Sequence, residues 1–311
     1  MKKLICLLLA VLMVMSLAAC GATNQLTDAL SSALNEAASE IKDAVPDDDA
    51  DSNGSGDYDS SITIDEQTLF TDGNAEVIVT GVEYDEYYGP EISVQIENKS
   101  DKKLTFSSQE CYINDYAVYA SLYTDVDAGK KAVDEITFSS SDMALAGITS
   151  IEKIEFSFRA YDEDYEDLVD SGLVEIKTSK SDSFKAPAAP EGTSLFNKDG
   201  IELVVVKYAK DGVDEYYAEP TLVMYAKNTT DKKLTISSDD LYVNGFKVDA
   251  TYYETLDPGK CSVSTIIFYE EYLEKSKIEK DAIEEFELNF KVYDSDTYDT
   301  ITKIEKAVYK P

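Results

Sequence analysis

Apolar and polar residues alternate along most of the chain beyond residue 61. Ile92, Val94 and Ile96 are each flanked by polar residues, and the same alternation recurs at 154–158. This pattern is typical of strands with one buried face. About seven such strands in each of the stretches 62–180 and 194–311, separated by turn-forming segments, predict an all-β fold of two antiparallel β-sandwiches. One helical turn is expected to interrupt each stretch, at 142–148 and at 270–281.

The first 19 residues have the pattern of an export signal. Lys2 and Lys3 precede an apolar stretch at 4–15, which is too short to span a bilayer. Leu17-Ala18-Ala19-Cys20 follows. These residues resemble the lipobox of bacterial lipoproteins, in which the cysteine receives a diacylglycerol and becomes the mature N-terminus. The resemblance implies that residues 1–19 are removed and that Cys20 is lipidated, with acyl chains such as palmitate anchoring the protein to the membrane.

Residues 20–61 form a separate segment between the lipid site and the first stretch of strands. Apolar residues recur there at steps of three and four from Leu26 to Val45, which predicts a short helix that ends before Pro46. The remainder, to residue 61, is rich in Asp, Ser and Gly and has almost no apolar residue. We expect it to be a disordered acidic tether.

An internal repeat organises the rest of the chain. Asn98-Lys99-Ser100-Asp101-Lys102-Lys103-Leu104 returns 130 positions later as Asn228-Thr229-Thr230-Asp231-Lys232-Lys233-Leu234. Further matches at or near this offset extend the repeat over 62–180 and 194–311, which predicts two homologous domains. The intervening residues 181–193 contain Pro187 and Pro190 among alanines and predict a semi-rigid linker.

The strand rhythm, the repeated turn and the lipobox together resemble Gram-positive bacterial lipoproteins with tandem immunoglobulin-like domains. The resemblance covers both repeats and implies the sandwich architecture, but it carries no functional residues over to this chain. The chain has no Trp, so the Cys…Trp…Cys signature of antibody domains is absent.

The charge of the chain narrows the choice of partners. It has 62 Asp and Glu against 28 Lys and Arg, and a formal net charge of −34. Such a surface repels phosphate backbones and anionic lipid headgroups, so we expect no nucleic-acid partner, and contact with the membrane only through the lipid anchor. Glycans, peptides, basic proteins and metal ions remain as candidate ligands, although the charge also serves solubility.

No catalytic constellation is recognisable in the sequence. There is no His, so a Ser or Cys nucleophile would need a Lys or carboxylate as its base, and no nucleophile motif is present. Cys111 and Cys261 occupy non-equivalent places in the two repeats, which favours two buried thiols over a disulfide framework. We predict no catalytic residues and no enzymatic activity.

Two acidic loops are candidate calcium sites. Asp162 and Asp164 lie in the loop 161–167, and Asp294 and Asp296 lie in the matching loop 293–299. Calcium binds several oxygen ligands, so these four carboxylates are the candidate metal ligands, and Ca²⁺ is the one candidate cofactor. A solvated hairpin turn is the alternative interpretation.

Tyrosines beside carboxylates are the candidate ligand-binding residues. Tyr87 and Tyr88 in the first repeat correspond to Tyr216 and Tyr217 in the second, with acidic residues next to each pair. Exposed tyrosines of this kind can stack on sugars or grip basic peptides. The alternative is that these are ordinary strand residues whose rings pack while their hydroxyls stay hydrated.

These observations predict a non-catalytic lipoprotein held at the extracellular face of the cell membrane. Its tandem domains are expected to bind, or mediate contact with, a protein or a glycan. One alternative is an accessory or chaperone-like lipoprotein that acts on other exported proteins at the envelope. A hydrolase that uses paired carboxylates is the other alternative, and the abundance of Asp and Glu gives it no specific support.

Overall fold

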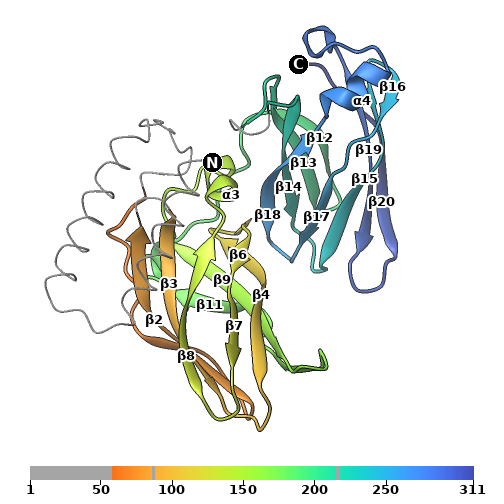
Figure 1. Cartoon of the computed structure of the whole chain (residues 1–311). Helices are drawn as coiled ribbons and strands as arrows, with labels where there is room; N and C mark the ends of the chain where they lie inside the picture. The colour runs from red at the N-terminus through yellow and green to blue at the C-terminus, as the bar shows by residue number, and fades with distance from the viewer. Residues whose placement is uncertain (1–57, 86–87, 214–217) are drawn as a thin grey trace, which may run out of the picture. The chain divides into compact units, whose positions relative to one another are not determined.

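The computed structural model describes residues 58–85, 88–213 and 218–311 (Figure 1). The predicted signal peptide, Cys20, the predicted helix and most of the acidic tether lie outside these residues. Within them, the only α-helices are α3 (Ser140–Leu145) and α4 (Glu270–Lys275). Two short 3-10 helices, η2 (Ser181–Ser183) and η3 (Lys280–Ala282), are also present. No helix in this part of the chain could cross a membrane. The predicted all-β fold is confirmed.

The first repeat consists of two layers of antiparallel strands. One layer has the order β1 (Gln67–Thr71), β2 (Ala75–Asp85), β3 (Gly89–Asn98), β8 (Lys131–Phe138), β6 (Ala120–Ser121). The other has the order β10 (Asp167–Asp170), β9 (Lys153–Tyr161), β4 (Leu104–Ile113), β5 (Tyr116–Ala117), with β7 (Tyr123–Val126) on β4 and β11 (Val174–Lys177) on β9.

The second repeat has the same plan. One layer has the order β12 (Thr193–Lys198), β13 (Ile201–Ala209), β14 (Thr221–Asn228), β18 (Cys261–Ile267). The other has the order β16 (Phe246–Val248), β15 (Leu234–Val243), β19 (Phe286–Asp294), β20 (Thr300–Tyr309), with β17 (Tyr253–Leu256) on β15. The order β1-β2-β3-β8 is therefore matched by β12-β13-β14-β18, and α3 by α4.

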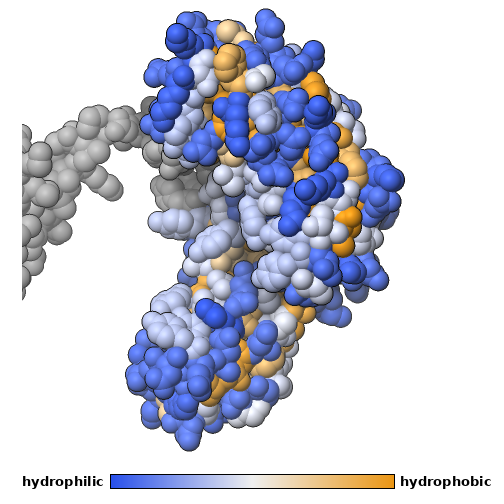
Figure 2. All heavy atoms as spheres, turned by 90° about the vertical axis from the view of Figure 1, so that its right-hand side faces the viewer, coloured by the Kyte–Doolittle hydropathy of each residue, from blue (hydrophilic) through white to orange (hydrophobic). Residues whose placement is uncertain are grey.

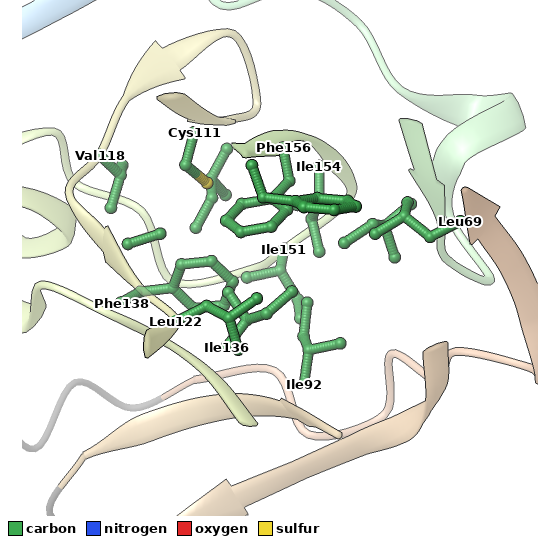
Figure 3. Close-up of a cluster of buried hydrophobic side chains, with 14 of the residues drawn as sticks. Leu69, Ile92, Cys111, Val118, Leu122, Ile136, Phe138, Ile151, Ile154 and Phe156 are labelled. Carbon is green, nitrogen blue, oxygen red and sulfur yellow. The ribbon is translucent and has the colours of Figure 1, made fainter. Parts of the chain in front are cut away.

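The alternating residues of the sequence fill the space between the layers. Figure 3 shows Ile92 of β3 and Ile136 of β8 on one side of the first core, with Ile154 and Phe156 of β9 on the other. All four side chains are fully buried. The apolar face of each strand thus supplies the core, as the alternation predicts.

The repeated Asn-x-Ser/Thr turn is a structural device. The Asn98 side-chain amide donates to the carbonyls of Lys102 and Val126, both at 2.8 Å, and its oxygen accepts from the Ser100 amide and hydroxyl. Asn228 makes the corresponding bonds in the second repeat, and both asparagines are completely buried. Because a buried amide is satisfied in this way, the motif is explained by the fold.

A ten-stranded sheet crosses the boundary between the repeats. β5 of the first repeat runs parallel to β18 of the second, with Tyr116 opposite Cys261. The order β10-β9-β4-β5 therefore continues into β18-β14-β13-β12. The domain boundaries at 180 and 194 stay a prediction. The sequence predicts only a linker between the repeats, whereas the structure joins them through a shared sheet.

Candidate functional site

Of the four candidate tyrosines, only Tyr88 lies within the described residues. Its side chain is 68% exposed, and its backbone amide donates to the Asp85 carboxylate at 2.8 Å. Tyr87, Tyr216 and Tyr217 lie outside the described residues. The structure therefore leaves this candidate patch as a prediction.

The two acidic loops are hairpin turns organised by their first aspartate. The Asp294 carboxylate accepts from the amides of Asp296 and Thr297 at 3.0 and 3.1 Å, and pairs with the Lys232 ammonium at 2.7 Å. Asp162 likewise accepts from the amides of Asp164 and Glu166 and pairs with Lys102. The Lys232 ammonium and the two amides hold the pKa of Asp294 below its usual value. Both first aspartates are thus engaged by protein groups.

The contact between the repeats, which we call the seam, brings together residues 110–118 and 153–155 of the first repeat and residues 257–263 of the second. Lys260, whose side chain is only 6% exposed, lies between Asp115 at 2.9 Å and Glu155. Lys153 pairs with the same two carboxylates at 2.8 and 2.9 Å. Burial opposes ionisation of Asp115, yet the two ammonium groups outweigh it and hold its pKa below the usual value. The seam therefore contains a half-buried network of charges.

A second group of polar contacts lies in the last residues of β4. The Tyr112 hydroxyl donates to the Asp257 carboxylate at 3.0 Å and accepts from the Asp257 amide at 3.2 Å. Lys233 pairs with Glu110 and with Asp257. Tyr112 also packs in the second core although it belongs to the first repeat. The Tyr112–Asp257 and Lys233–Glu110 contacts each tie one repeat to the other.

Apolar side chains on the outer face of the second repeat complete the seam. Val204, Val223 and Val263 are buried against the first core, and the rings of Tyr225 and Tyr116 meet edge to face at 6.5 Å. The sequence contained a signal for this surface. Residues 222–226 form a continuous apolar run, which is typical of a strand buried on both faces. In the equivalent residues 92–96, apolar and polar residues alternate.

The two cysteines are buried free thiols, as the sequence predicts. Cys261 begins β18 at the seam, where its amide donates to the Asp115 carbonyl at 3.0 Å. Burial raises the pKa of the Cys261 thiol to about 12 and raises that of Cys111 as well. Neither thiol ionises at neutral pH in this environment.

A cavity of about 250 Å³ lies at the seam, with walls from both repeats. The end of β4, the segment 117–119 and Asp142 of α3 form one side, and β17 and β18 form the other. Gln109 and Tyr119 at its edge are exposed, so the cavity is open to solvent. It is the feature of this region that sequence reasoning missed, because it exists only once the repeats are in contact.

The floor of the cavity holds hydroxyl groups that lack partners. Ser262 Oγ and Ser264 Oγ line it, and Tyr252 Oη lies beside them. The two serine hydroxyls are close to the Tyr252 hydroxyl and the Glu254 carboxylate, but within the described part of the chain none of the three hydroxyls has a partner at hydrogen-bond geometry. Tyr252 and Ser262 are each 2% exposed. A buried hydroxyl left in this state costs about 1–3 kcal/mol of stability. Retained unpartnered groups of this kind are a reason to look for a ligand.

Carboxylates make the cavity acidic. Burial raises the pKa of Glu254, the nearby Ser264 and Ser262 hydroxyls oppose this, and the Asp142 carboxylate raises it further. Glu110 also has a raised pKa, because burial outweighs its ion pair with Lys233. No group of three or more Asp, Glu, His or Cys residues within the described ranges could hold a metal ion. The site thus combines a desolvated carboxylate with hydroxyl groups.

Comparison with known proteins gives no family. No protein-family model matches the sequence, and no curated protein matches it. Among solved structures, the chain is similar to the YadV chaperone, with 12% identity and a TM-score of 0.22 over 71% of this chain and 92% of that one. An Amycolatopsis orientalis exo-chitosanase, CsxA, gives 15% identity and a TM-score of 0.22 over 72% of this chain and 26% of the enzyme. A protein of unknown function from Porphyromonas gingivalis W83 gives 8% identity and a TM-score of 0.19 over 70% of this chain and 89% of that one. TM-scores this low carry no argument about function.

Proposed function

We propose that this protein is a lipid-anchored binding protein of the extracellular face of the membrane, which holds a protein or glycan ligand without transforming it. The lipobox-like residues ending at Cys20 support the location. The observation that carries the binding role is the acidic cavity at the seam, because both repeats build its walls and its floor retains hydroxyl groups without partners.

The charge of the chain supports the same proposal. A net charge of −34 favours ligands that are neutral or cationic. On the face shown in Figure 2, hydrophilic residues cover most of the described surface, with smaller hydrophobic areas between them. A recessed cavity on such a surface favours a specific ligand over general adhesion.

The location is tested by lipid labelling in the producing cell. Cys20→Ser is expected to abolish incorporation of a fatty-acid analogue and to release the protein from the membrane or leave it unprocessed. Cys6→Ser, which changes a cysteine inside the predicted signal peptide, is the matched control and should leave labelling unchanged. Equal labelling of wild type and Cys20→Ser would remove the lipid anchor from the proposal.

The binding role is tested with purified lipidated protein in detergent micelles. Soluble glycans and extracellular proteins of the producing organism are titrated, and any bound ligand is recovered and its mass measured. We expect saturable binding and an unchanged ligand mass. A shortened ligand would instead support the hydrolase alternative.

A further inference from the structure

Comparison of the two repeats shows that the polar floor of the seam cavity belongs to the second repeat alone. At matching positions 130 residues apart, Leu122, Thr124 and Ala132 of the first repeat are replaced by Tyr252, Glu254 and Ser262. Leu122 is buried in the first core. The fold therefore accepts an apolar side chain where the second repeat places a hydroxyl, and the hydroxyls are not needed to build the sandwich.

Of the three carboxylates that line the cavity, Glu110 alone has a cation partner among the described residues. Glu110 pairs with Lys233, and Asp142 accepts from the Tyr119 amide at 2.9 Å. Glu254 has no ion pair with any described residue, and its polar neighbours are the Ser262 and Ser264 hydroxyls. None of the described residues that line the cavity is Lys or Arg. The cavity therefore lacks positive charge at the point where its acceptors converge.

These acceptors match a primary ammonium group. An ammonium has one positive charge and three N–H donors, whereas a carboxylate and hydroxyl oxygens supply acceptors. An anionic ligand would be repelled by the surrounding carboxylates. The volume of about 250 Å³ lies below the range of about 300–1,000 Å³ that is usual for drug-sized ligands. It suits a single alkyl chain with a charged end.

We propose that the seam cavity binds a primary alkylammonium group, with Glu254 as the counter-ion and Ser262, Ser264 and Tyr252 as hydroxyl partners. The chemistry is that of a lysine side chain or of a free alkylamine. This inference rests on the proposed binding function and names the chemical class of its ligand. The cavity binds only while the seam is closed, because its walls come from both repeats.

The test is calorimetric titration of the purified lipidated protein with n-butylammonium chloride at fixed ionic strength. We expect n-butylammonium to bind saturably at one site. We expect no binding of n-butanol, which has the same alkyl chain without the charge. Glu254→Gln should weaken binding at least tenfold. Ser262→Ala, which restores the residue of the first repeat, should weaken it severalfold while the melting temperature is kept or raised.

Glu91→Gln is the matched control. Glu91 is a partly buried glutamate on β3 whose pKa is also raised, first by burial and then by neighbouring carboxylates, and it does not line the cavity. Its substitution should leave the affinity unchanged. Equal weakening by Glu91→Gln and Glu254→Gln would show general attraction to an acidic surface and overturn the proposal. Competition by equimolar Ca²⁺, or failure of every primary ammonium to bind, would overturn it too.

Two further titrations distinguish the sources of the ammonium. A lysine-containing peptide that binds Glu254-dependently and more tightly than n-butylammonium identifies a protein ligand, and equal affinity identifies a free amine; both support the cavity. If no ammonium binds while the protein still captures an intact extracellular protein or glycan, this inference fails and the proposed function stands. Loss of both would remove the proposed function as well.

Discussion

The two repeats share a strand order and a turn network, but they differ on the outer face of one sheet. In the first repeat, β3 and β8 place Ser93, Gln95 and Lys131 on that face. The matching positions of β14 and β18 carry Val223, Tyr225 and Cys261, which are buried at the seam. One copy of the fold thus keeps a polar face, and the other has an apolar face that the first covers. The difference teaches that the contact between the repeats results from apolar residues at a few outward-facing positions of the second repeat. The sandwich fold, which both repeats share, does not by itself produce it.

Separating the repeats should give the largest effect. The fragment 194–311 would expose the apolar face of Val204, Val223, Tyr225 and Val263, so we expect it to lose about 4 kcal/mol or more of stability relative to the same repeat in the whole chain. Fragment 62–180 should also lose stability, because it would expose Tyr112 and Tyr116, which are buried at the seam. Urea unfolding of both fragments and of the whole protein measures this. An unchanged midpoint for 194–311 alone would show that the seam adds no stability.

The lysine directly before β18, and the equivalent lysine directly before β8, give the next comparison. Lys260 is buried between two carboxylates, whereas its counterpart Lys130 is exposed. Lys260→Ala should cost up to about 3 kcal/mol, because it leaves two largely buried carboxylates, Asp115 and Glu155, with Lys153 as their one remaining cation. Lys130→Ala should cost less than about 0.5 kcal/mol, as surface substitutions usually do. Equal costs, measured by denaturant unfolding, would contradict the assignment of Lys260 to the seam.

Acid should weaken the seam through Asp115. Its folded-state pKa lies below the usual 3.8, so its contribution is complete above that value and is lost as the pH falls through the lower folded-state value. Glu110, whose pKa is raised, acts in the opposite sense and costs stability at neutral pH. Asp115→Asn should therefore flatten the loss of unfolding free energy as the pH falls below the usual pKa of 3.8. A wild-type and an Asp115→Asn curve with the same slope would exclude this carboxyl as the titrating group.

Removing an unpartnered hydroxyl should produce a smaller, positive change. Ser262→Ala is expected to raise the free energy of unfolding by about 1 kcal/mol, since a buried hydroxyl without a partner is lost. The mirror substitution Ala132→Ser in the first repeat should change it by less than about 0.5 kcal/mol, because that position is only half-buried. A clear loss of stability in Ser262→Ala would mean that the hydroxyl has a structural role.

Calcium should have the smallest effect. Asp162 and Asp294 already pair with lysines and accept from backbone amides, so Ca²⁺ and Mg²⁺ at matched ionic strength should raise the melting temperature equally, through screening of a highly charged chain. We expect neither acidic loop, 161–167 or 293–299, to distinguish Ca²⁺ from Mg²⁺. A rise of several degrees with Ca²⁺ alone, removed by Asp162→Asn with Asp164→Asn, would restore the acidic loop as a calcium site.

The strand content and the repeat were predictable from the sequence for a physical reason. A strand with one buried face must alternate, and a turn that buries Asn98 or Asn228 must keep its hydrogen-bonding residues, so both leave a local signature. The helical turn at α3 was anticipated to within three residues; α4 begins at Glu270 as expected but ends at Lys275, short of the expected 281.

The seam cavity was not predictable in the same way. Its residues come from β4, α3, β17 and β18, which are far apart in the chain, and no local pattern states that two repeats touch. The continuous apolar run at 222–226 predicts a second buried face but not the surface that covers it. Likewise, Glu254 looks like an ordinary exposed strand residue until the other repeat closes over it.

The buried thiol at the start of β18 allows the seam to report on its own opening. A cysteine is alkylated as its thiolate, and with a pKa of about 12 and 2% exposure Cys261 is almost inert while the repeats are in contact. Each excursion that separates β18 from Asp115 returns the thiol to ordinary reactivity for as long as it lasts. The rate of alkylation under native conditions therefore measures how often the seam opens, just as hydrogen exchange measures the opening of backbone amides. Measured at increasing ligand concentration, the alkylation rate of Cys261 would show how strongly a ligand in the cavity stabilises the contact between the two repeats.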